Sequence, residues 1–347
     1  MLAAVYHGPQ DLRVEEVPVP EIGADELLIK VQAASICGTD LRIFHGNHRM
    51  YAPGTVRIPG HEVVGTIAEV GKELYDFQEG ERVFVAPNMG CGHCPQCVSG
   101  NNNLCKSYDA LGVTINGGFA EYMRVPANAV RQGNVIPVSA TIDPAVSALM
   151  EPFACVLRGQ NAVHIKQGDV VLVVGAGPIG IMHTKLAKIS GAGRVIVSEP
   201  MADRAAQAGI MGADRVVNPT LEDLQNVIHQ ESEGNGADVI IVAAPVHVAQ
   251  ESALTLAAIG GRINFFGGLP KDRPTITFDS NLVHYKELMV TGTTACSTND
   301  CWQATRIVNS GLIDLSDLIS KRFPLKDAIE AFAAAEDRKS LKIVLEP

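Results

Sequence analysis

The sequence predicts a two-domain α/β protein, with a β-rich N-terminal domain followed by a doubly wound parallel sheet. Three observations support this fold class. The chain has 347 residues, which exceeds the size at which a single hydrophobic core usually keeps growing. Its first part consists of short apolar runs broken by proline and glycine, as in small β domains. From about residue 169, short apolar runs alternate with amphipathic segments, which is the α/β pattern.

Short β-strands are expected along the N-terminal domain. Apolar runs between turn residues mark them at 12–14, 17–20, 26–33, 65–71 and 80–85. The glycines at the ends of the last two runs indicate strands that turn tight corners, as in a small barrel.

Continuous apolar strands are expected in the second domain, because a parallel strand is buried on both faces. The six candidates are 169–174, 194–198, 215–217, 237–242, 261–266 and 288–291, and a helix is expected over 178–190.

The final segment is expected to contain helices at 299–310 and 326–335 and a strand at 341–345. A lone terminal strand needs a sheet partner, so we expect the chain to return to the N-terminal domain. The expected domains are therefore 1–154, 155–292, and a return of 293–347 to the first domain.

Composition excludes several classes of partner. A net charge of −10 would repel a phosphate backbone, so no nucleic-acid partner is expected. The sequence has no uncharged apolar run of about 18 residues, and its N-terminus lacks the pattern of a signal peptide. No membrane partner is expected, and a cytoplasmic location is predicted.

A cluster of four cysteines is the strongest local signal. Cys91, Cys94, Cys97 and Cys105 form a C-x2-C-x2-C-x7-C lobe rich in glycine and asparagine. Two-residue gaps allow thiolates to bend back onto one ion, and four sulfurs make a closed tetrahedral zinc site. An iron–sulfur cluster is the alternative, although its usual spacing differs in the last gap. Four thiolates fill the coordination shell, so His93 within the lobe is expected to face solvent.

A glycine-rich turn follows the first strand of the second domain. Gly175, Gly177 and Gly180 form G-x-G-x-x-G, with Pro178 and Ile179 opening the following helix. The first glycine permits the tight turn, the second lets the backbone approach a pyrophosphate, and the third lets the helix press on the strand. The turn therefore predicts a dinucleotide site.

Glu199 ends the next strand, nineteen residues after the last glycine of the turn. A carboxylate there can accept both ribose hydroxyls and would repel a 2′-phosphate, which favours NAD over NADP. Arg204 could neutralise such a phosphate, or it could simply be a solvated helix charge.

A second set of metal-binding residue types is spread over the first domain. His61 and Glu62 lie side by side in a glycine-framed apolar stretch, Cys37 precedes them, and Glu151 lies in a later apolar stretch. A catalytic zinc site uses mixed ligands of these types and leaves one position open. A glutamate buried at position 151 without a cation would be unfavourable.

Taken together, the chain resembles the zinc-dependent medium-chain alcohol and polyol dehydrogenases, in the branch of sorbitol dehydrogenase and threonine dehydrogenase. The resemblance covers essentially the whole chain and implies a GroES-like catalytic domain joined to a Rossmann domain. The motifs that carry it are Cys37-Gly38-Thr39-Asp40, Gly60-His61-Glu62 with Gly65, Gly71 and Gly80, the four-cysteine lobe, Glu151-Pro152 and the glycine-rich turn.

The resemblance also implies roles for single residues. Cys37 and His61 match the fixed ligands of a catalytic zinc, and Glu62 matches a glutamate that either binds zinc or exchanges with water. Glu151 matches the ligand of the polyol branch. Thr39 matches the hydroxyl that forwards the substrate proton, and Asp40 orients the ligands. With a structural zinc in the cysteine lobe, two zinc ions per chain are expected.

One residue departs from the family pattern. Many relatives have a histidine at the position of Arg42, and an arginine cannot relay a proton at neutral pH. His45 could replace that function, or the proton could leave through water. Arg42 could bind an anionic group such as a sugar-alcohol phosphate, or form a structural salt bridge.

The predicted activity is NAD-dependent oxidation of a secondary alcohol of a polyol, such as sorbitol, xylitol or arabitol, free or phosphorylated, to a ketose. Alternatives are oxidation of L-threonine or another small alcohol and, from another class, a non-catalytic dinucleotide-binding protein. A homodimer or homotetramer is implied by the resemblance. Candidates for lining the substrate pocket are Ile43, Phe44, Asn47, Phe119 and Cys296.

Overall fold

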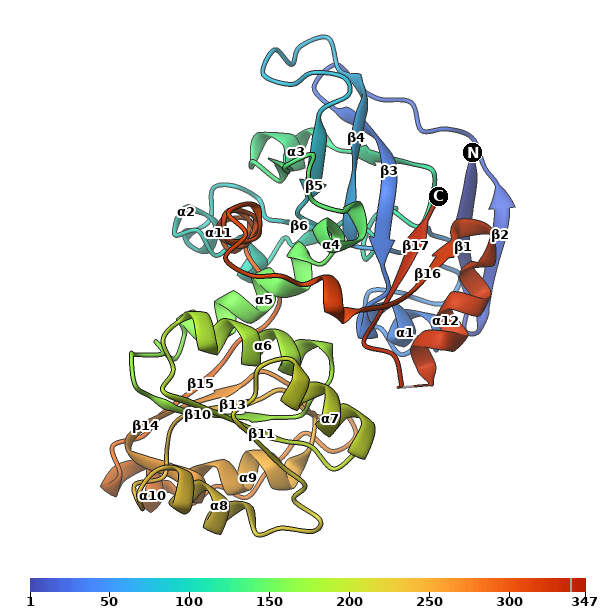
Figure 1. Cartoon of the computed structure of the whole chain (residues 1–347). Coiled ribbons are helices and arrows are strands. Elements are labelled where there is room, and N and C mark those ends of the chain that lie inside the picture. The colour runs from blue at the N-terminus through green and yellow to red at the C-terminus, as the bar shows by residue number, and fades with distance from the viewer. Residues whose placement is uncertain (338) are drawn as a thin grey trace. The chain divides into compact units, whose positions relative to one another are not determined.

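The computed structural model describes residues 1–337 and 339–347, and it divides the chain into two compact units (Figure 1). Unit 1 combines Met1–Ala154 with Cys296–Pro347, and unit 2 is Cys155–Ala295. Within the described residues, no helix has both the length and the apolar character needed to cross a bilayer. The predicted fold class, a β-rich domain and a doubly wound domain, is confirmed.

A seven-stranded sheet forms the frame of unit 1. Its order is β16-β17-β3-β4-β5-β9, and β8 pairs with one end of β3. The strands are β3 (Leu27–Ser35), β4 (Glu62–Val70), β5 (Arg82–Val85), β8 (Tyr122–Val125), β9 (Val135–Pro137), β16 (Ile319–Pro324) and β17 (Lys342–Glu346). Because β17 pairs with the end of β3, the C-terminal strand joins the sheet built by the N-terminal segment.

Two smaller ribbons complete the β structure of unit 1. They are the hairpin of β1 (Leu2–Gly8) with β2 (Asp11–Glu16), and the pair β6 (Asn88–Met89) with β7 (Asp109–Ala110). The strand expected at 17–20 was a wrong prediction, because that segment is irregular. Two of its four residues are prolines, which cannot donate to a strand ladder.

Most helices of unit 1 are short, and α5 continues into unit 2. They are α1 (Gly38–Phe44), α2 (Pro95–Val98), α3 (Ala127–Arg131), α4 (Pro144–Ala148), α5 (Met150–Asn161), α11 (Thr298–Asn309) and α12 (Ala328–Glu336). Single 3₁₀ turns lie at Asn102–Leu104, Ser316–Leu318 and Leu325–Asp327.

Aromatic packing anchors α1 to the core of unit 1. Ile43 of this helix is fully buried, and the ring centroid of Phe44 lies 5.6 Å from that of Phe332 on α12. Phe332 also meets Phe119 edge to face at 5.8 Å. Ile43 and Phe119, two residues expected to line the substrate pocket, are thus core residues. Each buried ring or aliphatic side chain contributes about 1.5–3 kcal/mol, so the C-terminal end of α1 is held firmly.

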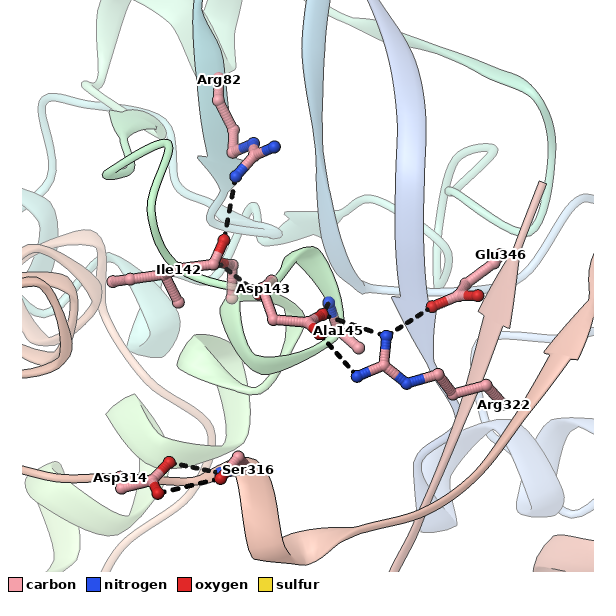
Figure 2. A network of polar contacts seen from close by, with 9 residues as sticks. Arg82, Ile142, Asp143, Ala145, Asp314, Ser316, Arg322 and Glu346 are labelled. Atoms are coloured by element: carbon pink, nitrogen blue, oxygen red, sulfur yellow. Dashed lines mark hydrogen bonds and ion pairs between the residues drawn. The ribbon is translucent and has the colours of Figure 1, made fainter.

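A polar network fixes the segment that leads into α4 and α5 (Figure 2). Asp143 caps α4 by accepting a hydrogen bond from the Ala145 N–H at 2.8 Å, and it accepts two more from Arg322 of β16. The same guanidinium donates to Glu346 of β17 at 3.0 Å. Arg82 of β5 donates to the Ile142 carbonyl at 2.9 Å, so the segment is tied to both halves of the sheet.

Unit 2 is built on six parallel strands in the order β12-β11-β10-β13-β14-β15. All six predicted strands are present: β10 (Val170–Val174), β11 (Arg194–Ser198), β12 (Arg215–Val217), β13 (Ala237–Val242), β14 (Ala257–Phe265) and β15 (Met289–Gly292). Figure 1 shows α6 (Pro178–Ile189) and α7 (Ala202–Ile210) on one face of the sheet, and α8 (Leu224–Glu231), α9 (His247–Leu256) and α10 (Ser280–Tyr285) on the other. The strand order reverses between β10 and β13, which is where such sheets bind ligands.

The Arg322 network makes stability depend on pH. The hydrogen bond from Arg322 is the main reason that the pKa of Asp143 lies below its usual value. The pair therefore stabilises the fold above the unfolded pKa of about 4, and this contribution is lost as pH falls through the lower folded pKa. Because Arg322 is exposed, Arg322→Ala should lower the unfolding free energy by at most about 1 kcal/mol near pH 7.

Urea unfolding followed by circular dichroism would measure this difference at several pH values. The difference between wild type and Arg322→Ala should shrink below about pH 4. Arg306→Ala removes an exposed arginine of α11 and serves as the control. A pH-independent difference would contradict the assignment.

Candidate active site and metal centres

The four cysteine sulfurs of the lobe lie at the separations that a single tetrahedral ion requires. The Sγ–Sγ distances are 3.5 Å for Cys94–Cys97, 3.8 Å for Cys94–Cys105 and 4.0 Å for Cys91–Cys97. A tetrahedral site with Zn–S bonds of about 2.3 Å places its sulfurs about 3.8 Å apart. The lobe therefore has the dimensions of a zinc site.

Backbone N–H groups point at these sulfurs. Cys94 N–H donates to the Cys91 sulfur at 3.4 Å, and Cys91 N–H donates to the Cys105 sulfur at 3.3 Å. Backbone hydrogen bonds lower the pKa of Cys91 to about 6, whereas burial and the neighbouring thiols raise the pKa of Cys97 to about 12. Four thiolates this close repel one another, and a divalent cation is what allows all of them to be charged.

The surroundings of the lobe explain its local sequence. A Cβ at Gly90 would overlap the Cys97 sulfur, so only glycine fits there. The side chain of Gln132 holds the Gly90 peptide by donating to its carbonyl at 2.7 Å and accepting from its N–H at 3.1 Å. His93 is exposed, with Nδ1 2.9 Å from the Cys91 carbonyl, as expected for a residue outside the coordination shell.

A second group of potential ligands forms where β3 and β4 end side by side. The ligand atoms of Cys37, His61 and Glu62 lie within 4.8 Å of one another. Cys37 follows β3 and caps α1, and Glu62 is the first residue of β4. The register pairs Ser35 with Glu62, which brings the two ends together.

Glycine is required immediately before His61. Gly60 has φ +96°, a conformation that favours glycine, and a Cβ there would lie 2.6 Å from the Phe119 ring. Its carbonyl packs against Gly112 and Gly117, where any side chain would overlap it. The loop that carries His61 is therefore fixed by close backbone contacts.

Asp40 contacts two members of this group, Cys37 and His61. One of its oxygens accepts a hydrogen bond from the Cys37 N–H at 2.8 Å, and the other lies 3.3 Å from His61 Nδ1 without hydrogen-bond alignment. Burial works against protonation of His61, but Asp40 and Cys37 outweigh burial and raise the His61 pKa well above its usual range. Buried atoms of His61, Asp40 and Glu62 have no hydrogen-bond partner among the described residues. Unsatisfied buried atoms beside a set of potential ligands fit a bound cation.

Lys342 is a member of this site that the sequence did not reveal. Its side chain is 4% exposed, and Nζ donates to Glu62 Oε2 at 2.5 Å and to the Ile36 carbonyl at 3.2 Å. Burial alone would lower the Lys342 pKa, but Glu62 and Cys37 together raise it by more. The Lys342 pKa therefore lies above its usual value. A lysine inside the otherwise apolar strand 341–345 was the available sequence signal.

Glu151 does not join the tight group of Cys37, His61 and Glu62. It lies in the first turn of α5, and its Oε1 accepts from the Cys296 thiol at 3.5 Å. Burial is the main cause of its raised pKa, which the nearby Glu62 raises further and His61 lowers. Glu151 is thus within electrostatic range of the ligand group, with a thiol as its neighbour.

The hydroxyl expected to forward a proton has an arginine beside it. Thr39 Oγ1 accepts a hydrogen bond from Arg42 Nη2 at 2.8 Å. His45, the expected replacement relay, instead pairs with Glu336 of α12 at 2.5 Å. Burial and then Arg42 and His61 lower the pKa of the half-buried His48 to about 4, so this histidine is neutral near the site.

The glycine-rich turn in unit 2 has the geometry of a phosphate-binding turn. Gly175 has φ +101°, and a Cβ at Gly180 would overlap the Gly175 carbonyl oxygen. A Cβ at Gly177 would meet open space, with Arg204 Nη1 at 3.8 Å as its nearest neighbour. Pro178 and Ile179 begin α6, so the helix N-terminus faces that space.

Glu199 holds this turn in place. It is buried, with Oε2 accepting from the Ala176 N–H at 2.8 Å and Oε1 accepting from the Met201 N–H at 2.9 Å. A carboxylate oxygen has a second lone pair, so these bonds leave acceptor capacity for ribose hydroxyls.

Comparisons with known proteins agree with both parts of this arrangement. The profile of the alcohol dehydrogenase GroES-like domain matches residues 23–138, and that of zinc-binding dehydrogenases matches residues 178–310. L-threonine 3-dehydrogenase from Bacillus velezensis is 35% identical over 344 residues, covering 96% of this chain and 95% of the relative. A zinc-binding dehydrogenase from Sinorhizobium meliloti, solved with NADP bound, has a TM-score of 0.91 and 32% identity, covering 100% of this chain and 99% of its own. Galactitol-1-phosphate dehydrogenase from Escherichia coli has a TM-score of 0.90 and 26% identity, covering 100% of both chains.

The cysteine lobe predicts a loss of zinc and stability when one thiol is removed. Cys94→Ser should lower the zinc content from about two ions per chain to about one, and it should destabilise the fold because a closed zinc site contributes to folding. Elemental analysis measures the zinc. Trp302, the only tryptophan, lines the same surface hollow as Cys97, so its fluorescence measures the unfolding of the lobe. His93→Ala should keep both ions; full zinc content in Cys94→Ser would refute the assignment.

The buried Lys342–Glu62 pair predicts strong coupling. Lys342→Met leaves the Glu62 carboxylate without its buried cation and should cost about 3–5 kcal/mol of unfolding free energy. The double variant with Glu62→Gln should recover part of that loss. Denaturant titration of zinc-free protein measures both, with the exposed Lys326→Met as control. Additive effects of the two substitutions would show that the pair is not coupled.

Proposed function

The chain belongs to the zinc-dependent alcohol dehydrogenases, a family of oxidoreductases, and within it we propose that this protein oxidises the secondary hydroxyl of a small polar substrate with NAD. The observation that carries this proposal is the close grouping of Cys37, which lies two residues before Thr39 in the chain, with the buried His61 and Glu62. The complete ligand set argues against a non-catalytic dinucleotide-binding protein.

The residues present divide the chemical work. Cys37 and His61, with Glu62 or Glu151, would hold a zinc ion that acts as a Lewis acid and lowers the pKa of the substrate hydroxyl. Thr39 accepts the hydroxyl proton as the bond to hydrogen breaks. Arg42 cannot accept that proton, so the proton passes from Thr39 to water.

Other residues keep these groups in position. Asp40 holds the Cys37 backbone and lies against His61, so both ligands are aligned before substrate arrives. Lys342 restrains Glu62 through the carboxylate oxygen Oε2. The other oxygen, Oε1, is left available to bind the zinc ion in exchange with a water molecule. The glycine-rich turn from Gly175 to Gly180 would hold a nicotinamide cofactor, which would supply the hydride acceptor.

L-threonine is the first candidate substrate. The relatives that are 33–35% identical over nearly the whole chain carry the name L-threonine 3-dehydrogenase. Threonine has a secondary hydroxyl on its β-carbon, next to the α-carbon that carries the amino group. Its oxidation therefore gives a 2-amino-3-oxo acid. This reverses the order expected from the sequence, where a polyol came first.

A polyol or polyol phosphate is the second candidate. The structural likeness to galactitol-1-phosphate dehydrogenase favours it, as does the glutamate at position 151. Both candidates place a secondary alcohol next to polar groups. They differ in whether the substrate carries a carboxylate or hydroxyl and phosphate groups.

A substrate panel tests the proposal. The purified protein with zinc should be assayed with L-threonine, sorbitol, xylitol, arabitol and galactitol 1-phosphate, each with NAD and NADP. The kcat/KM for L-threonine with NAD should exceed the others by at least about tenfold, or about 1.4 kcal/mol. Faster turnover of a polyol would overturn the substrate, and no turnover of any alcohol, with His61→Ala as the blank, would overturn the activity.

Glu199 predicts the cofactor preference. Glu199→Gln keeps an oxygen acceptor for the Ala176 N–H but removes the charge that repels a 2′-phosphate. The ratio of kcat/KM for NAD over NADP should fall by about tenfold or more. Glu222→Gln, on the surface of the same unit, is the control. An unchanged ratio in Glu199→Gln would remove Glu199 from the cofactor assignment.

The proposal also includes a homodimer or homotetramer located in the cytoplasm. Light scattering on the purified protein measures the oligomer, and a monomer would correct this part.

A further inference from the structure

We infer that Arg42 binds an anionic group of the substrate, a carboxylate or a phosphate, beside the hydroxyl that is oxidised. This inference rests on the proposed function and specifies the class of substrate that the same site accepts.

The position of Arg42 is set by the protein. Arg42 lies one turn after Thr39 on α1, and its Nη2 donates to Thr39 Oγ1 at 2.8 Å. The next two residues, Ile43 and Phe44, fix the helix in the core of unit 1. A guanidinium has five N–H donors in a fixed fork, so one bond to Thr39 leaves most of them available.

Arg42 forms no ion pair with a carboxylate in the described part of the chain. The chain has a net charge of −10, and many of its arginines pair with a carboxylate, as for Arg13, Arg131, Arg194, Arg215, Arg262 and Arg322. No carboxylate oxygen of the described residues lies within 4.0 Å of the Arg42 guanidinium. The structural salt bridge considered from the sequence is therefore not formed there.

The neighbours of Arg42 do not compete for it. His48 is neutral, since burial and the charges of Arg42 and His61 hold its pKa at about 4. Asp40 is buried and engaged with Cys37 and His61. Arg42 is exposed, has no acidic partner within 4.0 Å among residues 1–337 and 339–347, and is hydrogen-bonded to the proposed proton acceptor Thr39. Such an arginine is suited to bind an oxyanion of the substrate.

The contact with Thr39 also limits where the anionic group lies on the substrate. Thr39 receives the proton of the reacting hydroxyl, and the guanidinium is directly bonded to Thr39. The oxyanion must therefore be close to the carbinol carbon, within about two or three bonds, for one arginine to reach both. A 3-hydroxy acid such as threonine satisfies this requirement, and so does a polyol 1-phosphate that is oxidised at C2.

Matched substrates with and without the anionic group test the inference. The pairs are L-threonine with L-threoninamide, and galactitol 1-phosphate with galactitol. Each is assayed with wild type, Arg42→Gln and Arg42→Lys, and with Arg49→Gln as a control that removes an exposed charge from the following loop. The pair whose preference depends on Arg42 identifies the anionic group as carboxylate or phosphate.

Arg42→Gln should lower the preference in kcat/KM for the anionic member of one pair by about 10- to 100-fold, mainly through KM, as expected for a charge-assisted hydrogen bond. Arg42→Lys should retain part of the preference, and Arg49→Gln should leave it within about twofold. Because Arg42 also touches Thr39, a fall in kcat for both members alone does not support the inference. An unchanged preference in Arg42→Gln, or an equal loss in Arg49→Gln, would overturn it.

Calorimetric titration separates this inference from the proposed activity. The same matched compounds are titrated into wild type and Arg42→Gln without NAD. Tighter binding of the anionic member by wild type, lost in Arg42→Gln, supports the inference even if the protein oxidises none of these alcohols. Equal binding of both members by wild type would overturn it, whatever the turnover.

Discussion

The antiparallel pairing of β3 with β4 is the constraint on which the candidate active site depends. Its register places Ser35 opposite Glu62, so the chain that continues into Cys37 meets the chain that arrives through His61. Side chains alternate between the faces of a strand, and a slip by one residue would move every one of them to the other face. Gly60 and the close backbone contacts around it fix the start of β4. The pairing of β17 with β3 then adds Lys342 to the same end.

Both groups of potential metal ligands are short of positive charge when the protein is considered without metal ions. At the candidate active site, the acidic side chains Asp40, Glu62 and Glu151 are buried near Cys37, and the nearby positive charge comes from Lys342 and, without a metal, from protonated His61. In the lobe, backbone N–H groups favour thiolate at Cys91 while burial opposes it at Cys97. Buried charges without partners are unfavourable, so a bound cation would stabilise each arrangement. The two centres differ in their ligands, since four sulfurs close one shell and mixed ligands leave the other open.

Local patterns were predictable from the sequence, and contacts between distant segments were not. The four cysteines from Cys91 to Cys105 lie within fifteen residues, and the turn from Gly175 to Gly180 within six, so the local geometry follows from the spacing. Lys342 meets Glu62 across 280 positions, and no local pattern encodes that contact. His45 was a reasonable relay from its place in the sequence, but one turn of helix directs it to Glu336. The contact of Glu151 with Cys296 likewise depends on how α5 packs on the segment before α11.

The contact between Lys342 and Glu62 also orders events during synthesis of the protein. At about 5–20 residues per second on the ribosome, the 280 positions between them take roughly 15–60 s to translate. During that interval β3 and β4 can pair, but the Glu62 carboxylate has no lysine to accompany it into the interior. Unit 2 is continuous in sequence and has no such delay. The nascent chain therefore completes the nucleotide-binding unit before the buried acid beside Cys37 has its counter-charge, and the active site matures last.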